Sequence, residues 1–168
     1  MTRALVVTVS NRASAGVYED RSGPLLVSLL EEKAGCAVDG PVVVPDGEPV
    51  ERALRDGVAA SYDVIVTTGG TGLTPTDLTP EMTARVISRE IPGIAEAIRQ
   101  ANRDKVPTSI LSRGLAGQAG RTLIVNLPGS TGGVRDGVAV LAPVLRHAVE
   151  QINGGDHPRS DSDHPRSL

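Results

Sequence analysis

Four short apolar runs, separated by segments of helical periodicity, constrain the fold of this chain more than any other feature. The runs occupy residues 4–9, 42–44, 64–67 and 123–125. Nearly continuous apolar runs of this length are typical of strands that are covered on both faces, as in a parallel sheet. Apolar residues at helical spacing occupy residues 25–30, 50–58, 91–98 and 134–149. This alternation predicts an α/β fold: a three-layer α/β/α sandwich with a mostly parallel sheet and right-handed crossovers.

The chain of 168 residues is long enough for one domain with its own core. A domain of this size buries about 70% of the surface that its unfolded chain exposes. We place the domain at residues 1–155 and a polar tail at 156–168, where Asp-His-Pro-Arg-Ser occurs twice. A polar, proline-containing segment buries too little apolar surface to order itself, so we expect a flexible tail. A metal site made by its His and Asp side chains is the alternative.

The composition argues against several classes of protein. Cys36 is the only cysteine, which excludes a disulfide framework and a multi-cysteine zinc site. The apolar runs are much shorter than the ~20 residues of a membrane span, and the first residues resemble a strand rather than a signal peptide, so we expect a cytoplasmic protein. The net charge is −3, and Tyr18 and Tyr62 are the only aromatic residues. A chain without a basic excess or stacking rings is a poor candidate for binding nucleic acid.

A glycine-rich loop after the run at 64–67 is the most informative candidate site. Ligands of doubly wound sheets bind beyond the carboxyl ends of the strands. Gly69, Gly70 and Gly72 would allow main-chain N–H groups to approach a phosphate closely. The loop is not a P-loop, because no Lys-Ser/Thr pair follows the glycines, and it lacks the third glycine of a dinucleotide fingerprint.

Two aspartates follow predicted strands. In the glycine-rich loop, Thr79, Pro80 and Glu81 are expected to begin a helix with Thr79 as its N-cap. Asp77 has no such structural task and is therefore a candidate functional acid. Asp46 follows the second apolar run, where it is either the N-cap of the next helix or a metal ligand.

A second glycine-containing loop, at 126–134, opens the last predicted helix. It contains Pro128, Gly129 and Ser130. The N-terminus of a helix binds anions readily, so this loop is a candidate phosphate site. The alternative is a capped turn, with Ser130 or Thr131 as the cap.

Two further segments leave alternatives open. The loop at 10–24 carries small hydroxyl residues and two arginines, as an anion-binding loop would. It could equally be a surface loop in which Ser22 caps the following helix. Arg113 is either a bidentate phosphate clamp or a surface arginine.

The combination of acids and phosphate loops indicates the chemistry. Aspartates repel phosphates, so their presence beside two anion-binding loops predicts a divalent cation between them. Mg²⁺ is the natural choice, because one or two carboxylates bind it together with substrate phosphates. The prediction is a nucleotide enzyme that carries out transfer at phosphorus, which depends mainly on positioning and on stabilisation of charge.

Five groups of residues, in order along the chain, carry a family resemblance. They are residues 10–16 with 20–23, 45–46, 68–81, 111–113 and 126–130. Together they resemble the molybdopterin-binding Mog/MoaB family, which includes the gephyrin G domain, and are most similar to its Mog-type adenylyltransferase branch. The resemblance implies a trimer that transfers AMP from MgATP to the terminal phosphate of molybdopterin. The product would pass to a molybdate-insertion enzyme.

The resemblance also implies roles for individual residues. Asp46 and Asp77 would be the catalytic acids and the magnesium ligands. Ser14 and Ser112 would contact the pterin. The remaining contacts to the nucleotide and to the pterin phosphate would come from Gly69, Gly70, Thr71, Gly72, Pro128, Gly129 and Ser130.

Three positions depart from the family pattern. Thr76 stands where Arg is frequent, Gly47 where an acid is frequent, and Thr131 where Pro is common. The change at Thr76 removes a positive charge beside Asp77. It keeps a second hypothesis open, a molybdopterin carrier or scaffold without catalysis. A general nucleotide-binding regulator is the third.

Overall fold

A computed structural model describes residues 1–155, and the predicted tail at 156–168 lies outside the described residues. The strands are β1 (Arg3–Val9), β2 (Ala37–Val44), β3 (Val64–Thr68), β4 (Arg89–Glu90), β5 (Ala116–Ala119) and β6 (Thr122–Leu127). The helices are α1 (Asn11–Ser14), α2 (Ser22–Ala34), α3 (Glu48–Ala59), α4 (Thr79–Ala84), α5 (Pro92–Gln100), the 3₁₀ helix η1 (Pro107–Leu111) and α6 (Thr131–Ile152).

The six strands form one mixed sheet in the order β2-β1-β3-β6-β5-β4. β2, β1, β3 and β6 are parallel, whereas β5 runs antiparallel to β6 and β4 antiparallel to β5. The chain adds β2 on one side of β1 and β3 on the other, so the carboxyl ends of β1 and β3 meet at a topological switch point. The predicted mostly parallel α/β fold is confirmed.

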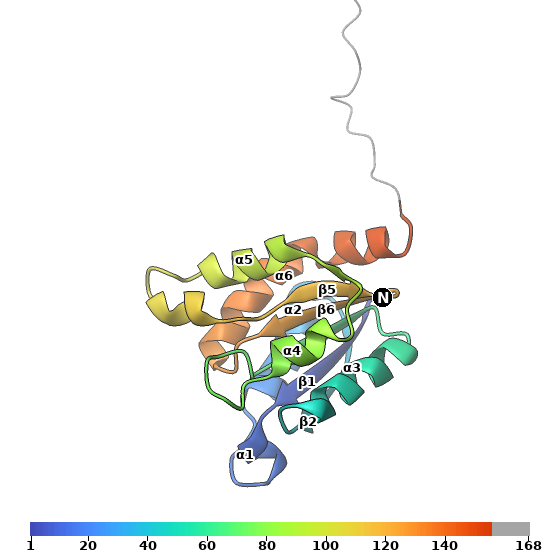
Figure 1. Cartoon of the computed structure of the whole chain (residues 1–168). Helices are drawn as coiled ribbons and strands as arrows, with labels where there is room; N and C mark the ends of the chain where they lie inside the picture. Colours follow the sequence, from blue (N-terminus) through green and yellow to red (C-terminus); the bar gives the residue numbers. More distant parts are fainter. Residues whose placement is uncertain (156–168) are drawn as a thin grey trace, which may run out of the picture.

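Helices cover both faces of the sheet, which makes three layers (Figure 1). On one face α2, α5 and α6 pack in a cluster that includes Leu26, Leu141 and Val125. On the other face α3 and α4 pack in a second cluster that includes Leu54 and Ile124. Val125 and Ile124 are neighbours in β6 and face opposite ways, which is why the central strands are apolar at successive positions.

The edges of the sheet differ from the sequence-based prediction. β2 begins at Ala37 rather than at the apolar run, and Val42 and Val43 are 42% and 36% exposed. The expectation of cover on both faces is therefore wrong for this strand, because it lies at the edge of the sheet. The short strands β4 and β5 were not predicted. Gly117 of β5 packs closely there, since a Cβ at this position would come within 2.6 Å of the Arg89 carbonyl oxygen.

Among residues 1–155, no helix has the length and apolar character that crossing a membrane requires.

Candidate active site

The loops that the sequence singled out meet at the carboxyl edge of the parallel strands. Thr68, the last residue of β3, pairs with Thr8 of β1 and with Leu127 of β6. The loops that follow these strands therefore start side by side. This is the edge at which open α/β sheets bind their ligands.

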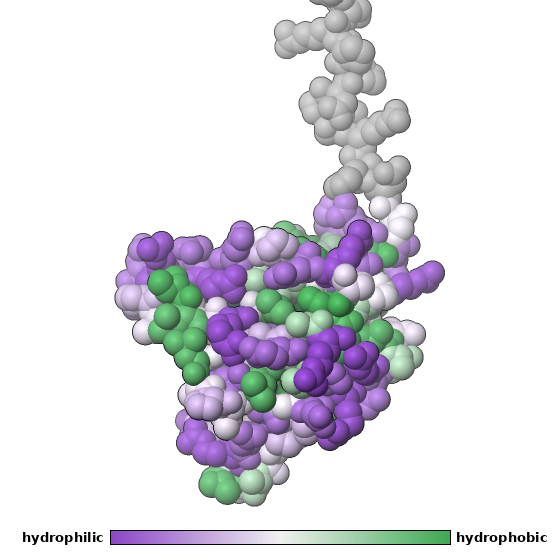
Figure 2. Space-filling view, in the orientation of Figure 1, coloured by the Kyte–Doolittle hydropathy of each residue, from purple (hydrophilic) through white to green (hydrophobic). Residues whose placement is uncertain are grey.

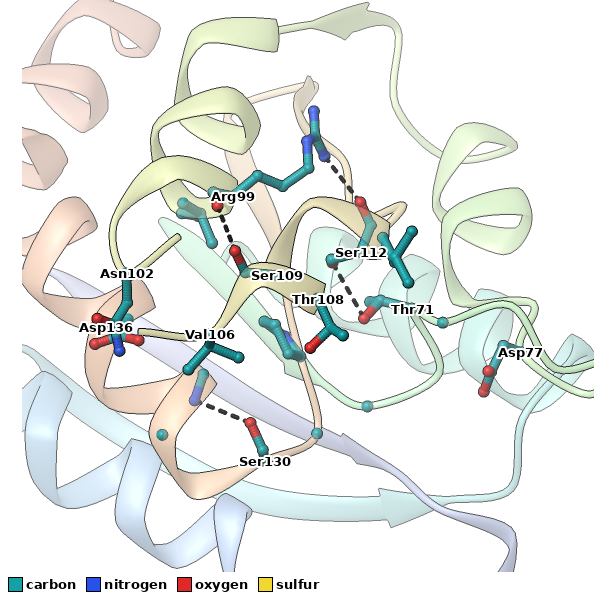
Figure 3. Close-up of a pocket in the computed structure, with 18 of the residues that line it drawn as sticks. Thr71, Asp77, Arg99, Asn102, Val106, Thr108, Ser109, Ser112, Ser130 and Asp136 are labelled. Carbon is teal, nitrogen blue, oxygen red and sulfur yellow. Dashed lines mark hydrogen bonds between the residues drawn. The ribbon is translucent and has the colours of Figure 1, made fainter. Parts of the chain in front are cut away.

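Two cavities adjoin at this edge. The first, of about 600 Å³, lies between the glycine-rich loop, α5, η1 and the start of α6 (Figure 3). The second, of about 540 Å³, lies between the same loop, α1 and the start of α2. Four residues line both cavities: Gly69, Gly70, Gly129 and Ser130. We call these four residues the shared wall.

Three of the four residues of the shared wall are glycines, which the site requires because main chain packs against main chain there. Gly69 and Gly70 have φ angles of +102° and +69°, which side-chain-bearing residues rarely adopt. A Cβ at Gly129 would come within 3.2 Å of the Cα of Gly69. The two loops are also hydrogen-bonded, because Gly69 N donates to the Leu127 carbonyl at 3.1 Å and Thr68 Oγ1 to the Pro128 carbonyl at 2.8 Å.

Ser130 is the N-cap of α6, and its Oγ accepts a hydrogen bond from Gly133 N at 3.0 Å. Of the two caps proposed for this turn, Ser130 is therefore the one in the structure. The N-terminus of this 22-residue helix points into the site, where its dipole and main-chain N–H groups favour an anion. A cap and an anion site are thus compatible here.

The structure brings the two predicted acids together. Asp77 lines the first cavity, and its Oδ2 accepts from Thr74 N at 3.1 Å. Asp46 Oδ1 accepts from Gly47 N at 2.8 Å and from Leu78 N, the residue after Asp77, at 3.1 Å. Asp46 lines neither cavity but lies directly behind the shared wall.

Asp46 is close enough to Gly70 that a Cβ on this glycine would come within 2.5 Å of its Oδ2. Burial raises the pKa of Asp46, and the negative charges of Asp77 and Glu81 raise it further, against the lowering effect of its two main-chain donors. The carboxylate is therefore held where other carboxylates repel it. A cation would relieve this repulsion.

The acid pair fits Mg²⁺. Asp46 Oδ2 and Asp77 Oδ1 accept no hydrogen bond from the described residues, so each acid keeps one oxygen for a ligand. Within the described range no group of three or more His, Cys, Asp or Glu residues could hold a metal. Mg²⁺ bound to nucleotides commonly takes one or two carboxylates, with phosphates and water as the other ligands.

Helix starts near the site differ from the predictions in three places. Thr79 is the first residue of α4 and not its N-cap, and its buried Oγ1 makes no hydrogen bond within the described part of the chain. Asp46 does not cap α3, whose N-cap is Gly47. Asp20 rather than Ser22 provides the side-chain bond at the start of α2, through Oδ1 and Gly23 N at 2.9 Å.

Some of the residues expected to contact ligands line the first cavity, whereas Ser14 lines neither cavity. Ser112 and Thr71 line the first cavity, and Ser112 Oγ donates to Thr71 Oγ1 at 3.4 Å (Figure 3). Ser14 donates to the Asn11 carbonyl at 3.0 Å and lines neither cavity. The two serines implied as pterin contacts therefore do not share a cavity.

Arg113 differs from the expectation of a phosphate clamp. Its Nε donates to the Gly72 carbonyl at 2.8 Å and its Nη2 to the Asp77 carbonyl at 2.7 Å, while Nη1 pairs with Glu81. It lines neither cavity. The guanidinium is directed into the protein loop because the main-chain carbonyls there form a matching set of acceptors.

Sequence reasoning missed the far end of the first cavity. Asn102 and Asp136 lie there, at the end opposite Asp77 (Figure 3), and Ile98, Val106 and Leu111 add apolar side chains to the lining of the cavity. Helical spacing assigned Ile98 to a core-facing side of its helix, and it lies at the edge of that core. Apolar side chains are exposed over and beside η1, where Val106 and Leu111 are 45% and 48% exposed (Figure 2), and only the folded structure shows this exposure.

The second cavity is more polar. Arg12 and Arg21 line it, together with Tyr18, whose ring lies 5.1 Å from the Arg12 guanidinium carbon. Thr8 and Ser22 add to the lining. The 10–24 loop therefore brings two arginines to this cavity, and anion binding by the loop stays a prediction.

The fold and site define an α/β domain in which two glycine-containing loops and two aspartates meet at the switch point of the sheet. Residues 5–147 match the family described as a probable molybdopterin binding domain. The chain belongs to this family. A solved structure of MogA is 59% identical, covers 89% of this chain and 99% of its own, and superposes with a TM-score of 0.87.

Curated relatives agree. A molybdopterin adenylyltransferase of Helicobacter pylori (strain J99) is 37% identical over 89% of this chain and 86% of the relative. A molybdenum cofactor biosynthesis bifunctional protein of Synechococcus elongatus is 38% identical over 92% of this chain but only 48% of the relative. The chain thus spans about half the length of the first curated relatives that it matches.

Proposed function

We propose that this chain is a molybdopterin adenylyltransferase. It transfers AMP from MgATP to the terminal phosphate of molybdopterin and releases pyrophosphate. The observation that carries the proposal is the shared wall, at which two cavities adjoin in front of an acid pair. The Helicobacter pylori relative that bears this activity in its name, and the likeness to MogA, support it.

Each cavity takes one substrate, and the reacting phosphates meet at the shared wall. An oxygen of the molybdopterin phosphate attacks the α-phosphorus of ATP and forms a new P–O bond. The bond between the α-phosphorus and the oxygen that bridges to the β-phosphorus breaks, and pyrophosphate leaves with the electron pair. Because the attacking oxygen is already anionic, the protein does not need a strong base.

The protein's task is to hold two anions in register. Main-chain N–H groups of Gly70, of Gly129 and of the α6 N-terminus supply fixed positive dipoles toward the phosphates. Asp46 and Asp77 would hold Mg²⁺, which neutralises phosphate charge when bound. The fixed geometry of the two loops orients the substrates, and such orientation supplies much of the rate in transfer at phosphorus.

The proposal extends to the surroundings of the enzyme. The family resemblance implies a homotrimer in the cytoplasm that passes adenylyl-molybdopterin to a molybdate-insertion enzyme. Sedimentation of the purified protein tests the trimer. Transfer of the product to a candidate partner tests the second step.

Incubation with molybdopterin, ATP and Mg²⁺ tests the activity itself. Pyrophosphate should appear only when all three are present, and mass spectrometry should detect adenylyl-molybdopterin in the same samples. Asp77→Ala should abolish turnover while molybdopterin binding persists. Normal turnover of this variant would refute the role of Asp77.

The competing function is a carrier or scaffold that binds molybdopterin without catalysis. It is favoured by Thr76, whose hydroxyl lies 3.3 Å from that of Thr74 and brings no positive charge to the loop. Tight pterin binding without consumption of ATP would support this alternative. Pyrophosphate release in the complete mixture would exclude it.

A further inference from the structure

Arg113 has no part in the proposed reaction as described so far, yet it is tied closely to the glycine-rich loop. Its main-chain N donates to the Thr71 carbonyl at 2.8 Å. Its guanidinium then bonds to Gly72, Asp77 and Glu81, one nitrogen to each. The side chain therefore crosses the loop that carries one of the two acids.

The peptide group between Asp77 and Leu78 links Arg113 to the other acid. The carbonyl of this group accepts from Arg113 Nη2 at 2.7 Å, and its N–H donates to Asp46 Oδ1 at 3.1 Å. In a trans peptide the C=O and N–H bonds point in opposite directions. The rigid Asp77–Leu78 peptide group thus lies between the Arg113 guanidinium and the Asp46 carboxylate, and its carbonyl is that of Asp77.

Arg113 also holds the near side of the same turn. Its Nε bonds to the Gly72 carbonyl at 2.8 Å, and a Cβ at Gly72 would come within 2.8 Å of Asp77 Oδ2. The Asp77 carboxylate therefore packs against a residue that Arg113 fixes. A planar guanidinium can hold both carbonyls at once, which the single ammonium of lysine cannot do as rigidly.

We propose that Arg113 is a positioning residue that sets the spacing of Asp46 and Asp77 through the Asp77–Leu78 peptide. This inference rests on the proposed function for its effect on rate. The structural part, that Arg113 fixes the Leu78 N–H on Asp46, does not depend on the reaction.

Steady-state kinetics of Arg113→Met and Arg113→Lys test the effect on rate. We expect kcat to fall about 100-fold in Arg113→Met, as it does when reacting groups are displaced by about 1 Å, while KM for ATP and molybdopterin stays within about threefold. Arg113→Lys should lie between this variant and the wild type. It also serves as the test should Arg113→Met fail to fold.

Two control variants separate the main-chain bonds from the charge and from general stability. Glu81→Gln removes the charged partner but leaves the bonds to the carbonyls, so kcat should stay within about threefold of wild type. Arg55→Met removes a comparable bond, from Arg55 Nη2 to the Arg85 carbonyl at 3.0 Å, on α3. It should leave kcat unchanged.

Hydrogen exchange at the Leu78 amide, followed by NMR on the protein without substrates, is the second measurement. Exchange should become at least about tenfold faster in Arg113→Met, as expected when a loop opens locally, and stay unchanged in both controls. Unaltered exchange at Leu78, or a rise in KM with kcat intact, overturns the proposal; the latter outcome would make Arg113 a direct phosphate ligand. If the wild type releases no pyrophosphate, the proposed function fails, and the Leu78 exchange still decides the role of Arg113.

Discussion

The Asp46 carboxylate is held by main-chain N–H donors, and this leaves its negative charge uncompensated. Asp46 Oδ1 receives two main-chain N–H groups. The nearby cation, Arg113, pairs with Glu81 instead and holds the pKa of that carboxyl below its ordinary value. The negative charge of Asp46 therefore lies near other carboxylates without a cationic partner among the described residues, at some cost to the stability of the fold.

Asp46→Asn should reveal this cost. The folded-state pKa of Asp46 lies above its ordinary value of 3.8, so the folded state binds protons more tightly than the unfolded state. The stability that this raised pKa contributes is fully present below pH 3.8 and is lost as the pH rises through the folded-state pKa of Asp46. Asn keeps the acceptor for both N–H groups and removes the charge. We expect Tm at pH 7 to rise by about 1–3 °C while turnover is lost.

Calorimetry between pH 4 and pH 7 checks this prediction. The difference in Tm between Asp46→Asn and wild type should shrink as the pH falls, because Asp46 takes up a proton in the folded state before it does so in the unfolded state. A variant that is less stable than wild type at pH 7 would show that the Asp46 charge stabilises the fold.

Cys36 provides a second prediction for a single residue. Its side chain is buried, and burial, with a smaller contribution from Asp63, raises the pKa of the thiol. Because the thiolate is the reactive form, alkylation by iodoacetamide at pH 7.5 should be at least about tenfold slower in the native protein than in urea. Equal rates in the two conditions would contradict the buried position.

Among the elements, those with a strong apolar period could be predicted from sequence and the weak ones could not. The helices that contain Leu26, Leu54 and Leu141 each bury one face, and the periodic spacing of their apolar residues marks that buried face. β4 and β5 have two and four residues, one of them Gly117, and carry no period to detect. Their pairing depends on contacts between distant segments.

The site was predictable to the extent that it depends on local backbone chemistry. Gly69, Gly70 and Ser130 could be singled out because tight turns and helix starts restrict the residue types. The partners of Arg113 could not be predicted, since they lie 32 to 41 positions away along the chain. The same applies to Asn102, which reaches the first cavity only because α5 packs beside α6.

Gly70→Ala tests the turn itself. The residue has a φ of +69°, and a Cβ there would collide with Thr79 Oγ1 and Asp46 Oδ2. Strain and overlap together should lower the free energy of unfolding by about 2–4 kcal/mol and reduce turnover sharply. Urea denaturation measures the first effect and pyrophosphate release the second.

Gly93→Ala is the matched control on α5. Nothing lies within 4 Å of the added Cβ, and alanine favours a helix over glycine. This variant should be unchanged or more stable by up to about 1 kcal/mol. If both variants lose stability equally, the conformation of Gly70 is not the cause.

At the scale of the whole molecule, the sheet separates two apolar cores that share the central strands. Leu141 of α6 is fully buried in the core beneath α2 and α6, whereas Val144 on the same helix is 45% exposed. The stability of the domain should therefore depend strongly on one of these positions and weakly on the other.

Leu141→Ala should reduce the free energy of unfolding by about 2–5 kcal/mol, because it removes buried methyl groups and leaves a cavity. Val144→Ala should change it by no more than about 0.5 kcal/mol. Urea denaturation of the two variants, with equal m-values, checks this contrast. Similar losses in both would mean that the outer face of α6 is buried in an assembly.

The wall common to the two cavities consists largely of peptide groups, which look alike in every sequence that can form the turn. Under the proposed function, replacements that change which purine or which pterin is accepted fall at the remote ends, for example at Asn102 and Asp136 or at Arg12. The specificity of one cavity can therefore be changed by substitutions that leave the lining of the other cavity intact. An engineer seeking a version that uses another nucleoside triphosphate could leave the junction untouched and redesign a single end.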